Sequence, residues 1–226
     1  MEPVYETLYD GKIHYFPGII EDPQWVLDTL DGIVNNTVSD YIPWTAHDAP
    51  GAYEYGTMKD VRRGNLDQDS LEDQEVVKKI INILDTAIWT GYRVWLVNKG
   101  LSGKDLEAWD EHFWRNRSPN FAVKFYHPGG DHGPHPDIDG DDPVGITTTL
   151  YMNDSYDGGA LTFIDVEGQP GIKPKAGSLV VFPSRAVHIS TPISNGIKCF
   201  TNEVQVWPRQ LMRDQLPLWD EETWPS

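Results

Sequence analysis

Hydrophobic residues follow two different periodicities along the chain, and each predicts a different kind of structure. Two stretches in the first half place apolar residues three and four positions apart, which is the spacing of one face of an α-helix. One stretch begins at Asp22-Pro23, where an N-cap type residue precedes a proline suited to the first helical position. The other covers residues 73–98. We expect helices at both places and a strand with a turn at 12–20.

From about residue 119 the pattern changes to short runs of β-branched and aromatic residues, interrupted by Gly, Pro, Asn and Asp. The runs expected to be strands are 121–126, 145–153, 160–164, 178–182, 186–190 and 197–207. Many short strands without intervening helices favour a β-sandwich or barrel. We therefore predict a mainly β fold in which a helical and mixed region at 1–118 supports a catalytic core at 119–207, followed by a tail at 208–226.

The composition supports a folded chain and disfavours some partners. Its 226 residues are enough for one domain with an appendage or for two small domains. Hydrophobic residues make up 39% and aromatic residues 12%, which excludes bulk disorder. The net charge of −17 disfavours nucleic acid, whose phosphates need a basic surface, and favours a basic partner or a small ligand.

Cysteine content and hydropathy give an expectation about the compartment. Cys199 is the single cysteine, so neither an intrachain disulfide nor a zinc site built from several thiolates is possible. The first residues lack the basic and apolar regions of a secretory signal. No apolar run approaches the roughly 18 residues that a membrane span requires. We therefore expect a cytoplasmic protein without a membrane partner.

Residues 40–70 separate the two predicted helices and are rich in Gly, Pro, Asp and aromatic residues. A long loop in a compact domain often has a function. We interpret this segment as a candidate substrate lid, with Tyr53 and Tyr55 as candidate substrate contacts. An irregular loop packed against the domain explains the same composition equally well.

The segment 126–139, YHPGGDHGPHPDID, carries the most informative chemistry. His135 and Asp137 are two positions apart, and on a strand such residues point to the same side. A metal needs a third ligand, and His188 in the run 186–190 is the natural candidate. Two histidines and one carboxylate on one face leave coordination positions open, the arrangement of non-haem Fe(II) oxygenases. A polar strand face without a metal is the competing interpretation.

Lys198 follows His188 by ten residues and lies inside a predicted strand. A lysine inside a small barrel is costly unless its charge is paired. A dicarboxylate ligand would supply that pair. The competing interpretation is an ordinary lysine at the edge of a strand, solvated by water.

These residues occur together in a recognisable order: Tyr126, Gly129-Gly130, His135-Pro136-Asp137, Gly158-Gly159, His188 and Lys198. With this order and spacing, residues 121–207 resemble the 2-oxoglutarate- and Fe(II)-dependent dioxygenase superfamily, within it the prolyl 4-hydroxylase-like branch. The resemblance implies a double-stranded β-helix, or jelly roll, in which His135, Asp137 and His188 bind iron. It implies that Lys198 binds the distal carboxylate of 2-oxoglutarate. Fe(II), 2-oxoglutarate and O₂ are the implied cofactors and co-substrates, with ascorbate as a candidate addition.

The resemblance also suggests which other residues surround the ligands. Tyr126, Tyr151, Thr149 and Leu161 are expected to line the co-substrate pocket. Arg185, three residues before His188, is a candidate substrate contact at the mouth of the site; a surface role explains it equally well.

Two positions depart from the pattern of peptidyl prolyl hydroxylases. The stretch 142–145 lacks the arginine expected near the start of the strand after His-x-Asp. Val204 stands where a tryptophan is expected six residues after the basic co-substrate ligand, and Trp207 comes three residues later. Both departures concern the primary substrate rather than the co-substrate.

The expected reaction is hydroxylation of an unactivated C–H bond, with release of succinate and CO₂. We expect C4 of a peptidyl proline as the target. Because the chain is acidic, we expect the peptide or protein substrate to be basic. Three alternatives remain open. They are the same chemistry on a small molecule or free amino acid, a cupin-like metal-binding or zinc hydrolase domain, and a non-catalytic binding module.

Overall fold

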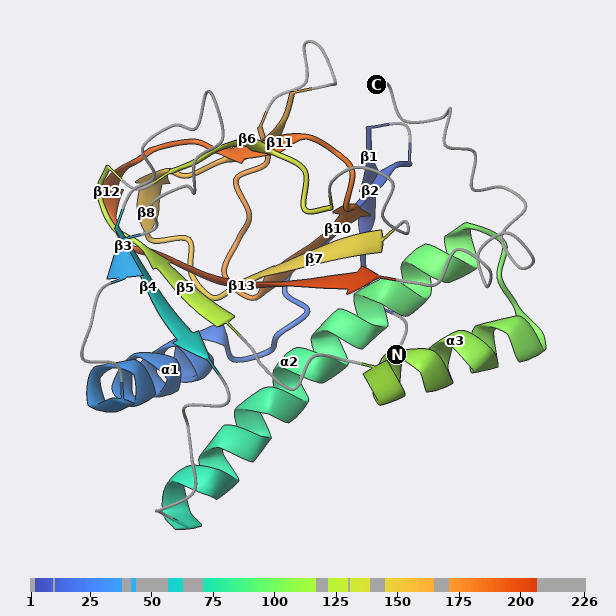
Figure 1. Cartoon of the computed structure of the whole chain (residues 1–226), viewed down its shortest axis with the longest axis horizontal. Coiled ribbons are helices and arrows are strands. Elements are labelled where there is room, and N and C mark those ends of the chain that lie inside the picture. The colour runs from blue at the N-terminus through green and yellow to red at the C-terminus, as the bar shows by residue number, and fades with distance from the viewer. Residues whose placement is uncertain are drawn as a thin grey trace.

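The computed structural model describes residues 3–9, 11–37, 42–43, 57–62, 71–116, 122–129, 131–138, 145–164 and 171–206 (Figure 1). The helices are α1 (Pro23–Thr37), α2 (Leu71–Asn98) and α3 (Gly103–Asn116). The strands before α2 are β1 (Glu6–Leu8), β2 (Ile13–Phe16), β3 (Ile42–Pro43) and β4 (Thr57–Arg62). Those after α3 are β5 (Ala122–Tyr126), β6 (His132–His135), β7 (Gly145–Tyr151), β8 (Tyr156–Gly158), β9 (Leu161–Phe163), β10 (Ser178–Pro183), β11 (His188–Ser190), β12 (Ile193–Gly196) and β13 (Lys198–Val206).

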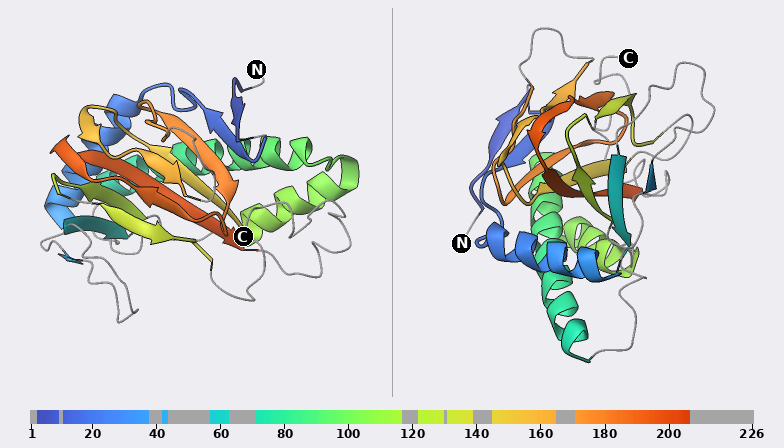
Figure 2. Two further views of the ribbon diagram at one scale, coloured as in Figure 1. Left: turned by 90° about the horizontal axis from the view of Figure 1, so that it is seen from above. Right: turned by 90° about the vertical axis from the view of Figure 1, so that its left-hand side faces the viewer.

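One large sheet and two small sheets form the β core. The large sheet has eight strands in the order β1-β2-β10-β7-β13-β5-β4-β3. The small sheets have the orders β6-β11-β9 and β12-β8. Figures 1 and 2 show the small sheets over one face of the large sheet and the helices along its other face. The large sheet therefore separates a space between sheets from a layer of packed helices.

Strand β7 shows how both faces of the large sheet are used. All seven of its residues are buried, although a strand with one solvated face would alternate between buried and exposed positions. Ile146 and Leu150 belong to a hydrophobic cluster that includes the buried face of α2. Tyr151 belongs to a second cluster, between the sheets. The run of buried residues thus follows from burial on two sides.

Both predicted helices are confirmed, with local reasons for their positions. The Asp22 side chain accepts a hydrogen bond from the backbone N–H of Trp25 at 3.0 Å, which caps the first turn of α1. Along α2, apolar residues three and four apart face the sheet and are buried: Ile80, Leu84, Ala87, Ile88, Tyr92, Trp95 and Leu96. Gly91 lies on the same face, where an added Cβ would come within 2.2 Å of Leu179 Cδ2 on β10. The missing side chain therefore allows α2 to approach the sheet closely.

The predicted strands after residue 119 are also confirmed, with boundaries shifted by a few residues. Strands β1, β8 and β12 were not predicted, and the structure differs from the prediction at two further places. Residues 103–116, for which no element was predicted, form α3, whose buried Leu106, Trp109 and Phe113 have helical spacing. Within the expected loop at 40–70, β3 and β4 are strands of the large sheet. The remainder of 40–70 and the tail at 208–226 lie outside the described residues.

The large sheet takes strands from both sides of residue 119, because β2 pairs with β10 and β4 pairs with β5. The first part of the chain thus contributes both helices and sheet edges to one β core. In the part of the chain that the structure describes, every helix is too short or too polar to cross a lipid bilayer.

Candidate active site

Three predicted metal ligands lie together between the sheets. His135 on β6 and His188 on β11 are directly opposite each other in the antiparallel register, with ring centroids 4.4 Å apart. Asp137 follows β6, and its backbone N–H donates to the Ser184 carbonyl at 2.8 Å. One potential ligand atom from each of the three residues lies within 4.8 Å of the others. Two residues far apart in sequence are thus brought to one point by strand pairing.

Backbone hydrogen bonds determine which ring nitrogen of each histidine faces this point. His135 Nδ1 lies 2.8 Å from the Gly133 carbonyl oxygen, and His188 Nδ1 lies 2.9 Å from that of Ala186. A carbonyl oxygen only accepts, so in both rings Nδ1 carries the proton and Nε2 keeps its lone pair. The two Nε2 atoms each lie 3.8 Å from an oxygen of the Asp137 carboxylate. Both histidines are therefore in the tautomer that binds a metal through Nε2.

Charge and burial at this point also suit a cation. The side chains of His188 and Asp137 are each 9% exposed. Burial lowers the pKa of His188, which keeps the imidazole neutral, although the nearby Asp137 carboxylate acts in the opposite direction. A buried carboxylate is costly unless a positive charge balances it. The donor set, two imidazoles and one carboxylate, is the set that leaves open positions on non-haem iron.

Thr147 holds the carboxylate in place and is itself in contact with Ser184, and neither residue was predicted from the sequence. Thr147 Oγ1 donates to Asp137 Oδ2 at 2.6 Å and lies 3.0 Å from Ser184 Oγ. Hydrogen bonds of this kind orient the first ligands of a metal site. The signal for Thr147 was present, since it lies two and four residues before the predicted Thr149 and Tyr151 on the same face of β7.

His132, at the start of β6, was also outside the predicted set. Its ring lies over that of His135, with 3.5 Å between centroids and 31° between planes. Burial lowers the pKa of His132, with smaller contributions in the same direction from His135 and Lys124. A ring at this distance restricts the rotation of the His135 side chain, a predicted metal ligand.

Lys198 is buried, with 1% of its surface exposed, and its surroundings fit the predicted role. Its Nζ donates to the Gly159 carbonyl and to Ser190 Oγ, both at 2.8 Å. Its Nζ is 5.9, 5.3 and 5.0 Å from the ring centroids of Tyr126, Tyr151 and Phe200. Burial lowers its pKa to about 7. An ammonium held against aromatic faces and neutral oxygens is prepared to bind an anion that balances its charge.

The Gly158-Gly159 turn has a structural reason to be glycine. Both residues have positive φ, 76° and 65°. A Cβ on Gly158 would come within 2.0 Å of the Pro192 carbonyl oxygen, so the turn passes too close to the connection between β11 and β12 for a side chain. The turn presents the Gly159 carbonyl to Lys198, which links two motifs that the sequence analysis treated separately.

The other predicted pocket residues lie around the same lysine. Tyr126 is the cross-strand partner of Lys198, and Tyr151 is that of Phe200. Leu161 is opposite Ser190, which accepts a hydrogen bond from Lys198. Thr149 is buried two residues before Tyr151 on the same face of β7. Whether these side chains contact 2-oxoglutarate stays a prediction.

The predicted substrate contacts are less well defined. Arg185 is half-buried between Ser184 and Ala186, both of which contact the predicted metal ligands through hydrogen bonds. Its role toward a substrate stays a prediction. Tyr53, Tyr55, Trp207 and 142–144 lie outside the described residues.

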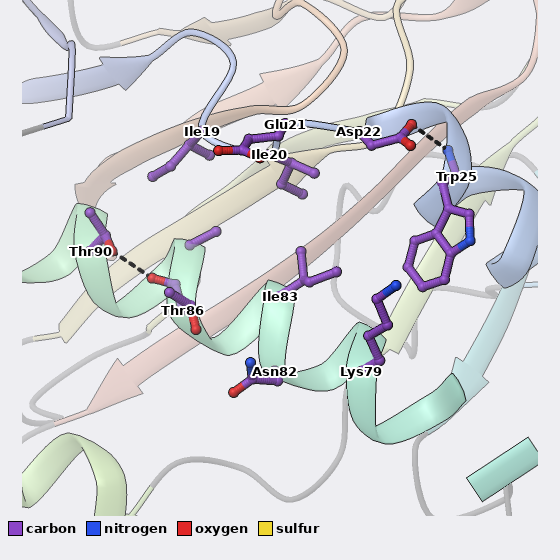
Figure 3. Close-up of a pocket in the computed structure, with 11 residues that line it drawn as sticks. Ile19, Ile20, Glu21, Asp22, Trp25, Lys79, Asn82, Ile83, Thr86 and Thr90 are labelled. Atoms are coloured by element: carbon purple, nitrogen blue, oxygen red, sulfur yellow. Dashed lines mark hydrogen bonds between the residues drawn. The ribbon is translucent and has the colours of Figure 1, made fainter. Parts of the chain in front are cut away.

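A separate groove lies on the helix side of the molecule. It has a volume of about 490 Å³ and runs between the connection from β2 to α1 and one face of α2 (Figure 3). Lys79 Nζ lies 4.2 Å from the ring centroid of Trp25 at one end. None of the predicted site residues lines this groove, so the predicted chemistry belongs to the space between the sheets.

Comparisons with known proteins agree with this arrangement. The sequence model of the 2OG-Fe(II) oxygenase superfamily matches residues 121–203. A PKHD-type hydroxylase of Nitrosomonas europaea is 41% identical over 69 residues, which cover 29% of this chain and 30% of that protein. The PKHD-type hydroxylase YbiX of Escherichia coli O157:H7 is 34% identical over 101 residues, which cover 44% of this chain and 42% of that protein. The matches thus span less than half of these curated relatives.

Two solved structures show the fold. A Trichoplax adhaerens prolyl hydroxylase, solved in complex with a hypoxia inducible factor peptide fragment, has a TM-score of 0.60 at 16% identity and covers 89% of this chain and 86% of its own. A Pseudomonas putida prolyl-4-hydroxylase has a TM-score of 0.51 at 18% identity, and the match covers 87% of this chain and 94% of that protein. The predicted jelly-roll core and the resemblance to prolyl 4-hydroxylase-like oxygenases are confirmed.

Proposed function

We propose that this chain is an Fe(II)- and 2-oxoglutarate-dependent oxygenase that hydroxylates a peptide or protein substrate. The observation that carries the proposal is the convergence of His135 Nε2, His188 Nε2 and the Asp137 carboxylate, beside a buried lysine. Iron supplies the oxidising chemistry in the 2OG-Fe(II) oxygenase superfamily, whose sequence model matches this region. The protein's part is to bind the metal and the co-substrate and to hold them in a fixed relative position.

In this proposal each described residue has a separate task. His135, Asp137 and His188 hold the iron, and Thr147 keeps the carboxylate oriented. Lys198 binds the distal carboxylate of 2-oxoglutarate, and the surrounding aromatic rings exclude water from that ion pair. The products are succinate, CO₂ and the hydroxylated substrate.

Peptidyl proline is the target that we propose. The support is the likeness in fold to two proteins that are called prolyl hydroxylases, one of them holding a peptide fragment. The net charge of −17 favours encounter with a basic, proline-containing segment. The single cysteine is compatible with the reducing conditions of the cytoplasm, where we propose that the protein acts.

A second candidate keeps the chemistry and changes the substrate to a small molecule or a free amino acid. Val204 favours it, because this position on β13 carries no tryptophan and is the cross-strand partner of Thr147 near the metal ligands. A zinc hydrolase with the same three ligands is less well supported, since hydrolysis has no use for a buried cation such as Lys198.

The first test measures the chemistry independently of the primary substrate. Purified protein supplied with Fe(II) and 2-oxoglutarate should release succinate slowly without a substrate and faster with one. His135→Ala should abolish turnover and weaken iron binding in equilibrium dialysis by at least about tenfold, because one ligand of three is lost. His112→Gln, on α3, is the matched control and should retain both properties. Unchanged iron binding in His135→Ala would remove the metal assignment.

The second test identifies the substrate class. A library of proline-containing peptides and a panel of small metabolites are incubated with the enzyme, and each product is examined by mass spectrometry for the gain of one oxygen atom. Hydroxylation at proline in peptides supports the primary proposal. Hydroxylation confined to metabolites transfers support to the second candidate.

A further inference from the structure

Tyr156, the first residue of β8, carries a buried polar group that the fold does not use. Only 3% of its surface is exposed, and it belongs to the cluster between the sheets. Among the residues that the structure describes, none forms a hydrogen bond with its hydroxyl. Leaving a buried hydroxyl unpaired costs free energy, and most such groups in proteins are paired. This hydroxyl is therefore a candidate to bind a molecule from outside the chain.

The ring of Tyr156 lies against the turn that holds Lys198. A Cβ on Gly159 would come within 2.9 Å of Tyr156 Cε2, an atom bonded to the carbon that bears the hydroxyl. The carbonyl of the same glycine accepts the hydrogen bond from Lys198 Nζ at 2.8 Å. The hydroxyl end of Tyr156 and the buried ammonium thus lie beside one residue.

The hydroxyl is also close to a residue of the predicted co-substrate pocket. Burial raises the pKa of Tyr151, and Tyr156 makes the largest of the smaller electrostatic contributions in the same direction. Such contributions fall with distance, so the two hydroxyls are near each other. The ring centroid of Tyr151 is itself 5.3 Å from Lys198 Nζ. Tyr156 therefore brings a further hydroxyl to the space around the lysine.

Contacts of its backbone and ring hold Tyr156 in place. Lys173 Nζ donates to the Tyr156 carbonyl at 2.8 Å and lies 5.5 Å from the ring centroid. Gly196 is its cross-strand partner on β12, where an added Cβ would come within 3.0 Å of Tyr156 Cα. A hydroxyl on a ring held in this way loses little further side-chain entropy when it binds a ligand.

We propose that Tyr156 is a specificity-determining residue of the co-substrate site, and that its hydroxyl donates a hydrogen bond to the distal carboxylate of 2-oxoglutarate. This inference rests on the proposed function and deepens it. A carboxylate accepts several hydrogen bonds, so the Lys198 ammonium and a hydroxyl can bind it together. A keto acid that ends in a methyl group leaves the hydroxyl unpaired, so Tyr156 favours a dicarboxylate.

Selectivity between two keto acids tests this assignment without turnover. Equilibrium dialysis with Fe(II) and without oxygen measures the dissociation constants of 2-oxoglutarate and of 2-oxovalerate, which carries a methyl group in place of the distal carboxylate. Tyr156→Phe should weaken the binding of 2-oxoglutarate about tenfold and should not weaken that of 2-oxovalerate. Tyr5→Phe removes a hydroxyl on the helix side, where Tyr5 stacks on Phe16, and is the matched control that should change neither constant.

The stability of the ligand-free protein separates a binding role from a structural one. Tyr156→Phe keeps the ring and removes an unpaired buried hydroxyl, so the urea midpoint should stay the same or rise. A hydroxyl that stabilises the fold requires the opposite, a lower midpoint.

Two outcomes would overturn the inference. One is an unchanged preference for 2-oxoglutarate over 2-oxovalerate in Tyr156→Phe, whether or not the urea midpoint falls. The other is equal weakening of both keto acids, which would show a change in the shape of the pocket. Both outcomes leave the proposed function intact. Absence of Fe(II)-dependent binding of 2-oxoglutarate to wild-type protein would instead overturn the proposed function, and this inference with it.

Discussion

On β7, neighbouring residues face opposite sides of the large sheet, and the two sides differ in chemistry. Leu150 faces a layer of aliphatic residues and tryptophans contributed by α2 and α3. Tyr151 faces a space lined by aromatic residues, the buried Lys198 and the predicted metal ligands. One short strand thus stabilises the fold with one face and forms the candidate site with the other.

The difference shows how a small β domain can tolerate a polar site. The helix side buries a large hydrophobic cluster between the sheet and the helices, and the burial of this apolar surface stabilises the sheet. The space between the sheets can then hold a buried cation, two imidazoles and a carboxylate, each costly to bury on its own. Substitutions on the two faces should therefore have different kinds of effect.

The largest effect on stability is expected on the helix side. Leu150→Ala should lower the free energy of unfolding by about 3 kcal/mol, because Leu150 is fully buried and its removal leaves a cavity. The adjacent Thr149→Ala, on the other face, should cost less than about 1 kcal/mol. Urea unfolding of both variants measures the contrast. Equal losses would mean that the two faces contribute equally to stability.

The complementary change is Lys198→Met, on the side of the candidate site. It should raise the 2-oxoglutarate concentration for half-maximal turnover about 100-fold, because a carboxylate would lose its buried charged partner. Stability should stay the same or rise, since a buried cation is replaced by an apolar side chain of similar length. Steady-state kinetics and urea unfolding test this, with Leu150→Ala as the comparison that keeps its 2-oxoglutarate requirement. A normal requirement in Lys198→Met would refute the assigned role.

A smaller effect concerns pH and a buried histidine on the helix side. Burial, and to a lesser extent Lys99, lower the pKa of His14 to about 4. The unfolded chain binds this proton near pH 6.5 while the folded chain does not, so the contribution is fully present above pH 6.5 and is lost as pH falls toward 4.

Between pH 7.5 and pH 5 this single group should lower the free energy of unfolding by about 2 kcal/mol. His14→Phe removes the titrating group beside Tyr5 and Phe16, whose rings stack on that of His14 or lie close to it. Urea unfolding at both pH values should show a shallower pH dependence in this variant. An identical pH dependence would contradict the buried neutral state of His14.

The smallest effect is the pH dependence of co-substrate binding. Burial lowers the pKa of Lys198 to about 7, and a bound carboxylate would raise it again. Below pH 7 the ammonium is already charged, whereas above pH 7 binding requires uptake of a proton. The dissociation constant for 2-oxoglutarate should therefore rise about tenfold from pH 6.5 to pH 8 with saturating metal. The guanidinium in Lys198→Arg is always charged, so this variant should bind 2-oxoglutarate without this pH dependence. A pH-independent dissociation constant in wild-type protein would contradict the lowered pKa of Lys198.

Much of the fold could be predicted because local patterns carry it. The helical spacing of α2 and the cap at Asp22 are visible in the sequence and reappear in the structure. Helix α3 was missed because its three buried apolar residues stand among many charged ones. Strand β4 was missed because its place beside β5 depends on pairing between distant segments, which leaves no local signal.

The candidate site was predictable to a similar extent. His135 and Asp137 were predicted to converge because of a shared strand period, whereas β6 ends at His135 and Asp137 is positioned after it by its backbone hydrogen bond to the Ser184 carbonyl. The hydrogen bond from Thr147 to Asp137 and the position of Lys124 were missed, because both depend on which strands pair and in which register.

The sequence by itself determined the helical spacing of α2, the cap of α1 and the set of side chains able to hold iron and a dicarboxylate. Only the tertiary structure decided that His188 stands opposite His135, that the Gly159 carbonyl accepts a hydrogen bond from the Lys198 ammonium, and that Lys124 lies on the same face of the large sheet as Lys198. The physical reason is the distance along the sequence over which each kind of interaction acts. Periodicity and capping act over a few residues, whereas strand register is selected by burial on both faces of a sheet whose strands come from the whole chain.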